Sequence, residues 1–200
     1  MKKIVFGLGL AMFALTAFKP AEELAIGASM PKGDVMMKDV SGKDINLRSS
    51  FKQNGLMVMF SSNACPYVEK NQARTTEVCN YAIKNGIGVV VLNSNEAFRN
   101  GEESLEEMKA YAKKQGYAWS YAVDKNNELA DAFGANRTPE CFLFNKDGKL
   151  AYHGAIDDSP NDAGSVKRNH LKEAVNELTQ GKDISVKTSR SVGCSIKRKV

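Results

Sequence analysis

The segment best equipped for chemistry is 60–68, which reads Phe-Ser-Ser-Asn-Ala-Cys-Pro-Tyr-Val. It joins an apolar run to a stretch of helical character, and Pro66 suits the first helical turn, where a missing N–H costs nothing. Cys65 therefore lies at a predicted helix N-terminus, where unpaired amides and the helix dipole stabilise an anion. Because the thiolate is the reactive form of cysteine, this position favours a nucleophile over a packed core thiol.

Three other cysteines accompany Cys65, namely Cys79, Cys141 and Cys194, and spacing alone cannot choose among their possible pairings. Cys79 lies on the same predicted helix as Cys65, roughly 20 Å away, which is too far for a disulfide. Burial preference predicts that Cys79 and Cys141 are core thiols, with Cys141 a weaker alternative partner of Cys65. The two histidines lie apart, with no cysteine at metal-ligand spacing, so no metal site and no cofactor are predicted.

Thr138-Pro139 lies between a helix that ends at a glycine and a predicted strand. A chain reversal before a strand often uses a cis-proline, so we expect a cis peptide bond here. We predict that Thr138 lines the site of Cys65 and that Pro139 shapes the groove that receives the substrate.

Apolar runs and turn signals predict the elements that would position these residues. Predicted strands lie at 56–60, 87–92, 121–123, 141–144 and 150–153, after a small hairpin formed by 35–38 and 44–47. Predicted helices lie at 67–84, 104–115, 127–133 and 166–179. This order predicts an α/β protein with a mixed central sheet flanked by helices, which is the thioredoxin fold, with an N-terminal β-hairpin and a C-terminal tail.

The chain divides into three predicted parts. Two lysines and an apolar run to Phe18 predict a signal peptide at 1–21, since the run is short for a membrane span; the alternative is an uncleaved anchor helix. Residues 22–181 form one domain, and 182–200 form a polar, basic tail that carries Cys194. The basic residues cluster in this tail without interleaved aromatics, which argues against nucleic-acid binding. We expect a periplasmic or secreted protein with no stable membrane span after signal removal.

Four motifs in the same order give the chain, from about Ala28 onward, a resemblance to the redoxin-type thioredoxin-like family, relatives of the alkyl hydroperoxide reductase/thiol-specific antioxidant proteins. Segment 60–68 resembles Phe-Thr-Cys-Asn-His-Cys-Pro-Tyr-Val, and 137–144 resembles Arg-Thr-Pro-Glu-Val-Phe-Leu-Phe. Segments 154–158 and 193–197 match Gly-x-Ile-Asp-Asp and Gly-Cys-Ser-Ile-Lys. The resemblance implies thiol redox chemistry.

Ser62 stands where the family has the first cysteine of Cys-x-x-Cys, so no disulfide can form within the motif. In one interpretation the site resembles a peroxiredoxin, in which the Ser62 hydroxyl binds peroxide and Arg137 stabilises the thiolate, although Val58 replaces the usual proline. In a second, the tail folds back and Cys194 pairs with Cys65, either in a redox cycle or only as a structural staple. In a third, the site is inactive in redox chemistry and the fold binds a partner.

We therefore predict an exported thiol-dependent oxidoreductase with Cys65 as nucleophile and with Cys194 and Ser62 in its catalytic set. The predicted substrate-binding residues are Thr138, Pro139, Arg137 and Pro66. Peroxide and protein disulfide both remain open as substrates, and the expected partners are a thiol reductant or a disulfide-bearing protein. The rival function is a non-catalytic, disulfide-stabilised binding module.

Overall fold

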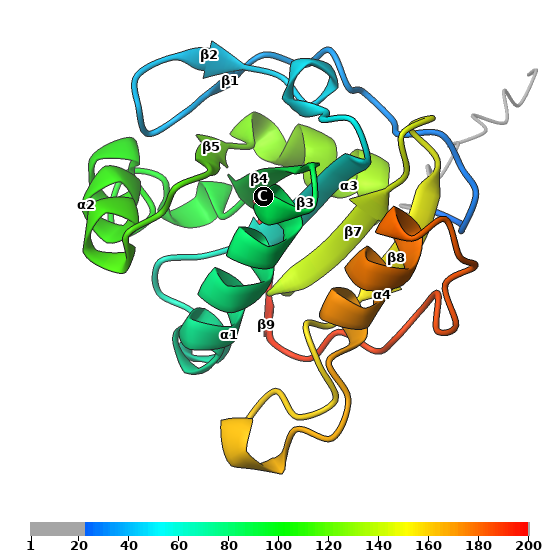
Figure 1. The fold of residues 1–200 in the computed structure, drawn as a ribbon. Helices are drawn as coiled ribbons and strands as arrows, with labels where there is room; N and C mark the ends of the chain where they lie inside the picture. Colours follow the sequence, from blue (N-terminus) through cyan, green and yellow to red (C-terminus); the bar gives the residue numbers. More distant parts are fainter. Residues whose placement is uncertain (1–22, 200) are drawn as a thin grey trace, which may run out of the picture.

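A five-stranded sheet forms the centre of the protein in a computed structural model that describes residues 23–199. Its strand order is β5-β4-β3-β7-β8 (Figure 1). β3, β4 and β5 are parallel, whereas β7 runs antiparallel to both β3 and β8. The strands are β3 (Gly55–Ser61), β4 (Ile87–Asn93), β5 (Ser120–Val123), β7 (Glu140–Phe144) and β8 (Leu150–Gly154). The predicted signal peptide at 1–21 lies outside the described residues.

Four helices pack against this sheet (Figure 1). They are α1 (Pro66–Lys84), α2 (Leu105–Gln115), α3 (Glu128–Phe133) and α4 (His170–Thr179). α1, α2 and α4 contribute buried side chains to one hydrophobic cluster, and α3 contributes to a second. Helices on both faces confirm the predicted thioredoxin-type α/β arrangement.

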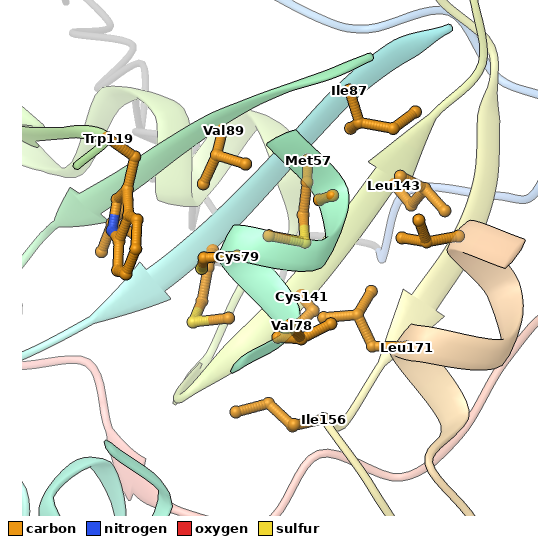
Figure 2. Close-up of a cluster of buried hydrophobic side chains, with 14 of the residues drawn as sticks. Met57, Val78, Cys79, Ile87, Val89, Trp119, Cys141, Leu143, Ile156 and Leu171 are labelled. Atoms are coloured by element: carbon orange, nitrogen blue, oxygen red, sulfur yellow. The ribbon is translucent and has the colours of Figure 1, made fainter. Parts of the chain in front are cut away.

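The alternation of β3 explains why there are two clusters, since successive strand residues point to opposite faces of a sheet. Met57 and Met59 lie in the cluster with α1 and α4, where Met57 is drawn close to Cys79 and Val78 in Figure 2. Phe60 lies in the other cluster and packs edge-on against Phe133 of α3. All seven residues of β3 are buried, as the continuous apolar run predicts.

Shorter elements complete the fold. β1 (Met37–Lys38) and β2 (Asp44–Ile45) form the predicted N-terminal hairpin, and β6 (Arg137–Thr138) pairs with β9 (Cys194–Ser195) in a separate two-stranded ladder. Four single 3₁₀ turns lie at Arg48–Ser50, Glu96–Phe98, Lys125–Asn127 and Ala163–Ser165. In the described part of the chain, no helix combines the length and the apolar character needed to cross a membrane.

The last helix begins later than its sequence pattern predicts. α4 starts at His170, whereas the predicted helix starts at 166. The preceding backbone is bound to a loop instead, because Lys167 N–H donates to the Asp158 carboxylate and Asp158 N–H donates to the Arg168 carbonyl oxygen. Tertiary hydrogen bonds therefore replace the first helical turn.

The C-terminal tail is packed on the domain, although its polar, basic sequence has little apolar content. Ile184 and Ile196 are 6% and 5% exposed, and each joins one of the two hydrophobic clusters. The tail backbone also pairs with β8, since His153 N–H donates to the Lys187 carbonyl oxygen and Ser189 N–H donates to that of His153. Ile184 and Ile196 are isolated apolar residues in a polar stretch, which is a weak sequence signal. The hydrophobic pattern alone therefore did not predict that the tail packs on the domain.

Candidate redox site

Cys65 lies at the point where β3 ends and α1 begins, as predicted. It is the N-cap residue of α1, with an extended backbone at φ −79° and ψ 119°, and Pro66 follows as the first helical residue. The Cys65 side chain is 5% exposed, whereas Pro66 is exposed beside it. The thiol is therefore positioned at the helix N-terminus but covered from solvent.

The group that covers Cys65 is Cys194. The two sulfur atoms lie 2.7 Å apart, although 129 residues separate them in the chain. The β6–β9 ladder produces this approach, because Cys194 lies opposite Thr138 in its antiparallel register. An S–S bond is about 2.05 Å long, so a shift of less than an ångström would join two sulfurs that are present here as thiols.

Gly193 makes the approach possible. A Cβ atom at this position would lie 2.0 Å from the Thr138 carbonyl oxygen, which is far inside van der Waals contact. Only a residue without a side chain lets the tail backbone come so close to Thr138. The Gly-Cys pair of the tail motif is therefore a steric requirement of the ladder.

The two sulfurs differ in acidity. Burial opposes ionisation of Cys65, but hydrogen bonding from Cys194, the Thr138 side chain and the Val68 amide outweighs it, so the pKa of Cys65 is lowered. Burial and the neighbouring Cys65 sulfur raise the pKa of Cys194. The pair therefore favours a Cys65 thiolate that accepts a hydrogen bond from the Cys194 thiol.

Cys79 and Cys141 are core thiols, as predicted. Both are fully buried in the cluster between the sheet and α1, where Figure 2 shows them among apolar side chains. Burial raises the pKa of each thiol well above its ordinary value. Neither is therefore suited to thiolate chemistry.

The Thr138–Pro139 peptide bond is cis, as the sequence predicts. Both residues are buried beside Cys65, and the Thr138 carbonyl oxygen lies 3.3 Å from the Cys65 sulfur. The Thr138 hydroxyl is buried beside the Cys65 sulfur and is engaged by no other group among the described residues. This group is therefore available to donate to a thiolate or to a bound substrate atom.

Ser62 also lies at the site, but its hydroxyl is already engaged. It donates to a carboxylate oxygen of Glu103 and accepts the Ala64 N–H at 3.1 Å. Glu103 and its neighbour Asn95 are residues that the sequence reasoning missed, because they lie in a polar stretch after β4 that resembles an exposed loop. The available signal was topological: β3 and β4 are parallel, so the residues that follow them meet at the same sheet edge.

Arg137 is not brought to the sulfurs. It is paired with Ser195, one residue along the ladder from the Thr138–Cys194 pair, and neighbouring residues of a strand point to opposite faces. Its side chain lines a hollow of about 1040 Å³ together with Arg190 and Ser195. Among residues 23–199, no group of three or more His, Cys, Asp or Glu side chains is placed to hold a metal ion.

Comparison with known proteins agrees with this geometry. A model of the AhpC/TSA family matches residues 26–153. The chain is 26% identical over 133 residues to the thiol-disulfide oxidoreductase ResA of Bacillus cereus, which covers 66% of this chain and 71% of that protein.

Two solved structures are similar over nearly their whole length. A hypothetical protein from Sinorhizobium meliloti is 31% identical with a TM-score of 0.81, covering 90% of this chain and 97% of that one. An uncharacterized conserved protein from Geobacillus kaustophilus is 32% identical with a TM-score of 0.81, covering 88% of this chain and 93% of that one. The family match ends at residue 153, whereas these two alignments cover most of the chain.

Proposed function

Because this chain belongs to the AhpC/TSA family, we propose that it is a thiol-disulfide oxidoreductase whose redox pair is Cys65 and Cys194. The observation that carries the proposal is the 2.7 Å separation of the two sulfurs across the β6–β9 ladder. Ser62 cannot supply the second thiol that disulfide exchange needs. Cys194 supplies it from the tail, so the pair replaces a Cys-x-x-Cys motif.

The exchange proceeds in two steps. The Cys65 thiolate attacks one sulfur of a substrate disulfide, a mixed disulfide forms, and the other substrate sulfur leaves as a thiolate that takes up a proton. Cys194 then loses its proton and attacks the Cys65 sulfur, which releases the second substrate thiol and leaves a Cys65–Cys194 disulfide. The substrate gains two electrons and the enzyme loses two.

A thiol reductant resets the enzyme in two further exchange steps, which begin at the other sulfur of the pair. The Cys194 sulfur is half-buried and Cys65 is buried, so the reductant meets Cys194 first. Cys65 then leaves as a thiolate, and its lowered pKa makes it the better leaving group of the two. A second thiol of the reductant attacks the reductant–Cys194 mixed disulfide, which releases Cys194 as a thiol and leaves the reductant as a disulfide. This accessibility favours a working disulfide over a purely structural staple, which would be shielded from exchange.

A protein disulfide fits the site better than a peroxide. The Ser62 hydroxyl that a peroxiredoxin-like site would direct at peroxide donates to Glu103 instead. The Arg137 side chain lines a hollow on the other face of the ladder. A substrate segment would lie against Thr138, Pro139 and the exposed edge of Pro66 once β9 moves off β6.

Non-reducing peptide mapping tests the pairing. The protein is oxidised with a mild oxidant, alkylated and digested, and we expect a Cys65–Cys194 peptide that millimolar dithiothreitol removes without denaturant. The Cys194→Ser variant should instead trap a mixed disulfide on Cys65 with a disulfide-bearing peptide. Cys141→Ala is the matched control, because its thiol is outside the pair.

Insulin reduction and hydrogen peroxide consumption, measured on the same preparation, decide the substrate. Insulin reduction without peroxide turnover is the expected result. Peroxide turnover alone would identify a peroxidase, and a Cys65–Cys194 bond without either activity would identify a disulfide-stabilised binding module.

We also propose that the protein is exported to the periplasm or beyond, where disulfides form and persist. The support is the sequence pattern at 1–21, two lysines followed by an apolar run. Mass spectrometry of the mature protein should find an N-terminus between Phe18 and Glu23. An intact Met1 in the membrane fraction would show that the segment is an anchor.

A further inference from the structure

Glu103 is a carboxylate held inside the protein next to the redox site. The residue is 1% exposed, and within 23–199 its side chain forms no ion pair. Its charge is instead surrounded by hydrogen-bond donors. Burying a carboxylate without hydrogen-bond donors is strongly unfavourable. Glu103 can therefore stay buried only while its donors stay in place.

Four donors share the two oxygens of Glu103. Oε1 accepts the Ser62 hydroxyl and the Asn95 side-chain amide, the latter at 2.8 Å. Oε2 accepts the Asn63 backbone N–H at 2.9 Å and the Asn93 side-chain amide at 2.6 Å. An ionised carboxylate only accepts hydrogen bonds, so it satisfies all four groups together.

One arm of this network reaches the loop that leads into Cys65. Ser62 and Asn63 are the residues bound by Glu103, and Ala64 N–H donates to the Ser62 hydroxyl. The whole turn between the end of β3 and Cys65 is thereby fixed to one side chain.

The other arm reaches the tail that carries Cys194. The Asn95 side chain donates to Glu103 with its nitrogen and accepts Lys197 N–H with its oxygen at 2.8 Å. Ala97 N–H donates to the Lys197 carbonyl oxygen at 3.0 Å, so both backbone groups of Lys197 are bound. Glu103 Oε1 thus links a position three residues before Cys65 to one three residues after Cys194.

Three of the four donors cannot become acceptors. Asn95 would lose Lys197 if its amide rotated, and the Asn93 oxygen already accepts Asn95 N–H at 3.1 Å. The Asn63 donor is a backbone amide, which cannot rotate at all. Only the Ser62 hydroxyl can accept as well as donate, so a glutamine at 103 would direct its own NH₂ group at one obligate donor or at two, depending on which way it turned.

We propose that Glu103 is a positioning residue for the redox pair: it ties the Cys65 loop to the Cys194 tail and so sets the equilibrium between dithiol and disulfide. The inference rests on the proposed function. Two thiols held together form a disulfide more readily than thiols on independent segments, because the entropy of bringing them together has already been lost. Without the link, the reduced tail gains freedom and the disulfide becomes easier to reduce.

The test is the equilibrium constant for Cys65–Cys194 disulfide formation in glutathione redox buffers, measured by quenching, alkylation and mass spectrometry. Glu103→Gln should lower this constant by about tenfold, the size expected for one lost hydrogen bond to a charged group. Glu102→Gln is the matched control, because the neighbouring Glu102 side chain is exposed and should leave the constant unchanged.

Asn95→Ala provides a second variant that cuts only the tail arm, and it too should lower the constant. Protection of Cys79 and Cys141 from alkylation confirms in each variant that the core is folded, so a general loss of structure is recognised directly. An unchanged constant in folded Glu103→Gln or Asn95→Ala would overturn the proposal while leaving the redox pair intact. Absence of the disulfide in the wild-type protein would instead overturn the proposed function, and this inference with it.

Discussion

The protein holds two pairs of cysteines in opposite environments. Cys79 and Cys141 lie in the core between the sheet and α1, whereas Cys65 and Cys194 lie where β6 and β9 meet. Cys65 is nearly as buried as the core thiols, at 5% against 0% exposed. Its pKa is nevertheless lowered, and theirs are raised.

Burial alone therefore does not make a thiol inert. Burial opposes ionisation at all four cysteines, and it is the main cause of the raised pKa in the core. At Cys65 the helix N-terminus, the Thr138 side chain and the Cys194 thiol supply donors that the core lacks. Polar partners therefore decide which buried thiol can react.

The largest effect should come from removing the nucleophile. Cys65→Ser should reduce insulin-reducing activity to the level of the buffer alone, because no thiolate remains to attack the substrate disulfide. Cys79→Ala and Cys141→Ala should keep the activity, since both thiols lie outside the site. Insulin-reducing activity that survives in Cys65→Ser would show that Cys65 is not the nucleophile, so the two cysteine pairs would not differ in function as proposed.

A smaller effect is expected from Gly193→Ala, which separates the pair without changing either sulfur. The new Cβ would meet the Thr138 carbonyl oxygen at 2.0 Å, so β9 must move away from β6. Overpacking of this kind costs about 1–3 kcal/mol, which corresponds to a loss of about 5- to 150-fold in the constant for disulfide formation. The fraction of protein with the Cys65–Cys194 disulfide, measured in a glutathione buffer of fixed composition, reports this loss.

Gly164→Ala is the control for that substitution, because a Cβ there would lie 3.4 Å from its nearest neighbour, on an exposed turn. Cys65 alkylation in the reduced protein should rise in Gly193→Ala, since the covering strand is displaced. Equal disulfide fractions in the two variants would show that the ladder does not hold the pair together.

Ser62→Cys tests the redox pair by placing a third thiol beside Cys65 and Cys194. The substitution rebuilds Cys-x-x-Cys, so a disulfide between positions 62 and 65 should compete with the Cys65–Cys194 bond and raise insulin reduction severalfold. Ser62 donates to Glu103, and a thiol donates more weakly, so some loss of thermal stability should accompany the gain. Peptide mapping that finds no new disulfide would contradict the placement of Ser62 at the site.

The smallest effect concerns pH. The pKa of Cys65 is lowered, so its thiolate persists below the ordinary cysteine value of about 8.5, and its alkylation rate should fall only as the pH drops through the lowered pKa. Cys194→Ala removes the thiol donor without supplying another, so the midpoint should move upward. Iodoacetamide labelling of the reduced protein across the pH range measures both, and Cys79 and Cys141 should stay unlabelled throughout. A wild-type midpoint at or above about 8.5 would remove the case for a tuned nucleophile.

Local pattern was sufficient for most of the fold. The apolar runs located β3 and β4 because strands buried on both faces carry no polar face to hide the signal. Ser104 located the start of α2, where its hydroxyl accepts the Glu107 N–H. These features depend on residues that are close together in the sequence, so they can be predicted from the sequence pattern alone.

The position of the predicted nucleophile was also evident from local sequence. Pro66 after Cys65 places the thiol at a helix N-terminus, and with Ser62 in the motif any disulfide of Cys65 needs a partner from outside it. The sequence left open which cysteine that partner is, because four thiols allow several pairings and loop closure over a long chain costs little more than over a short one.

The partner of Cys65 and the contacts of Glu103 became evident only from the packing of distant segments. The proximity of Cys194 depends on the register of the β6–β9 ladder, on the space left by Gly193 and on Ile196 in the core. In the sequence, Glu103 is one acidic residue in a polar stretch. Its contacts depend on the parallel strands β3 and β4, which end at the same edge of the sheet. Contacts between distant segments arise from packing, and no periodicity or spacing along the chain encodes them.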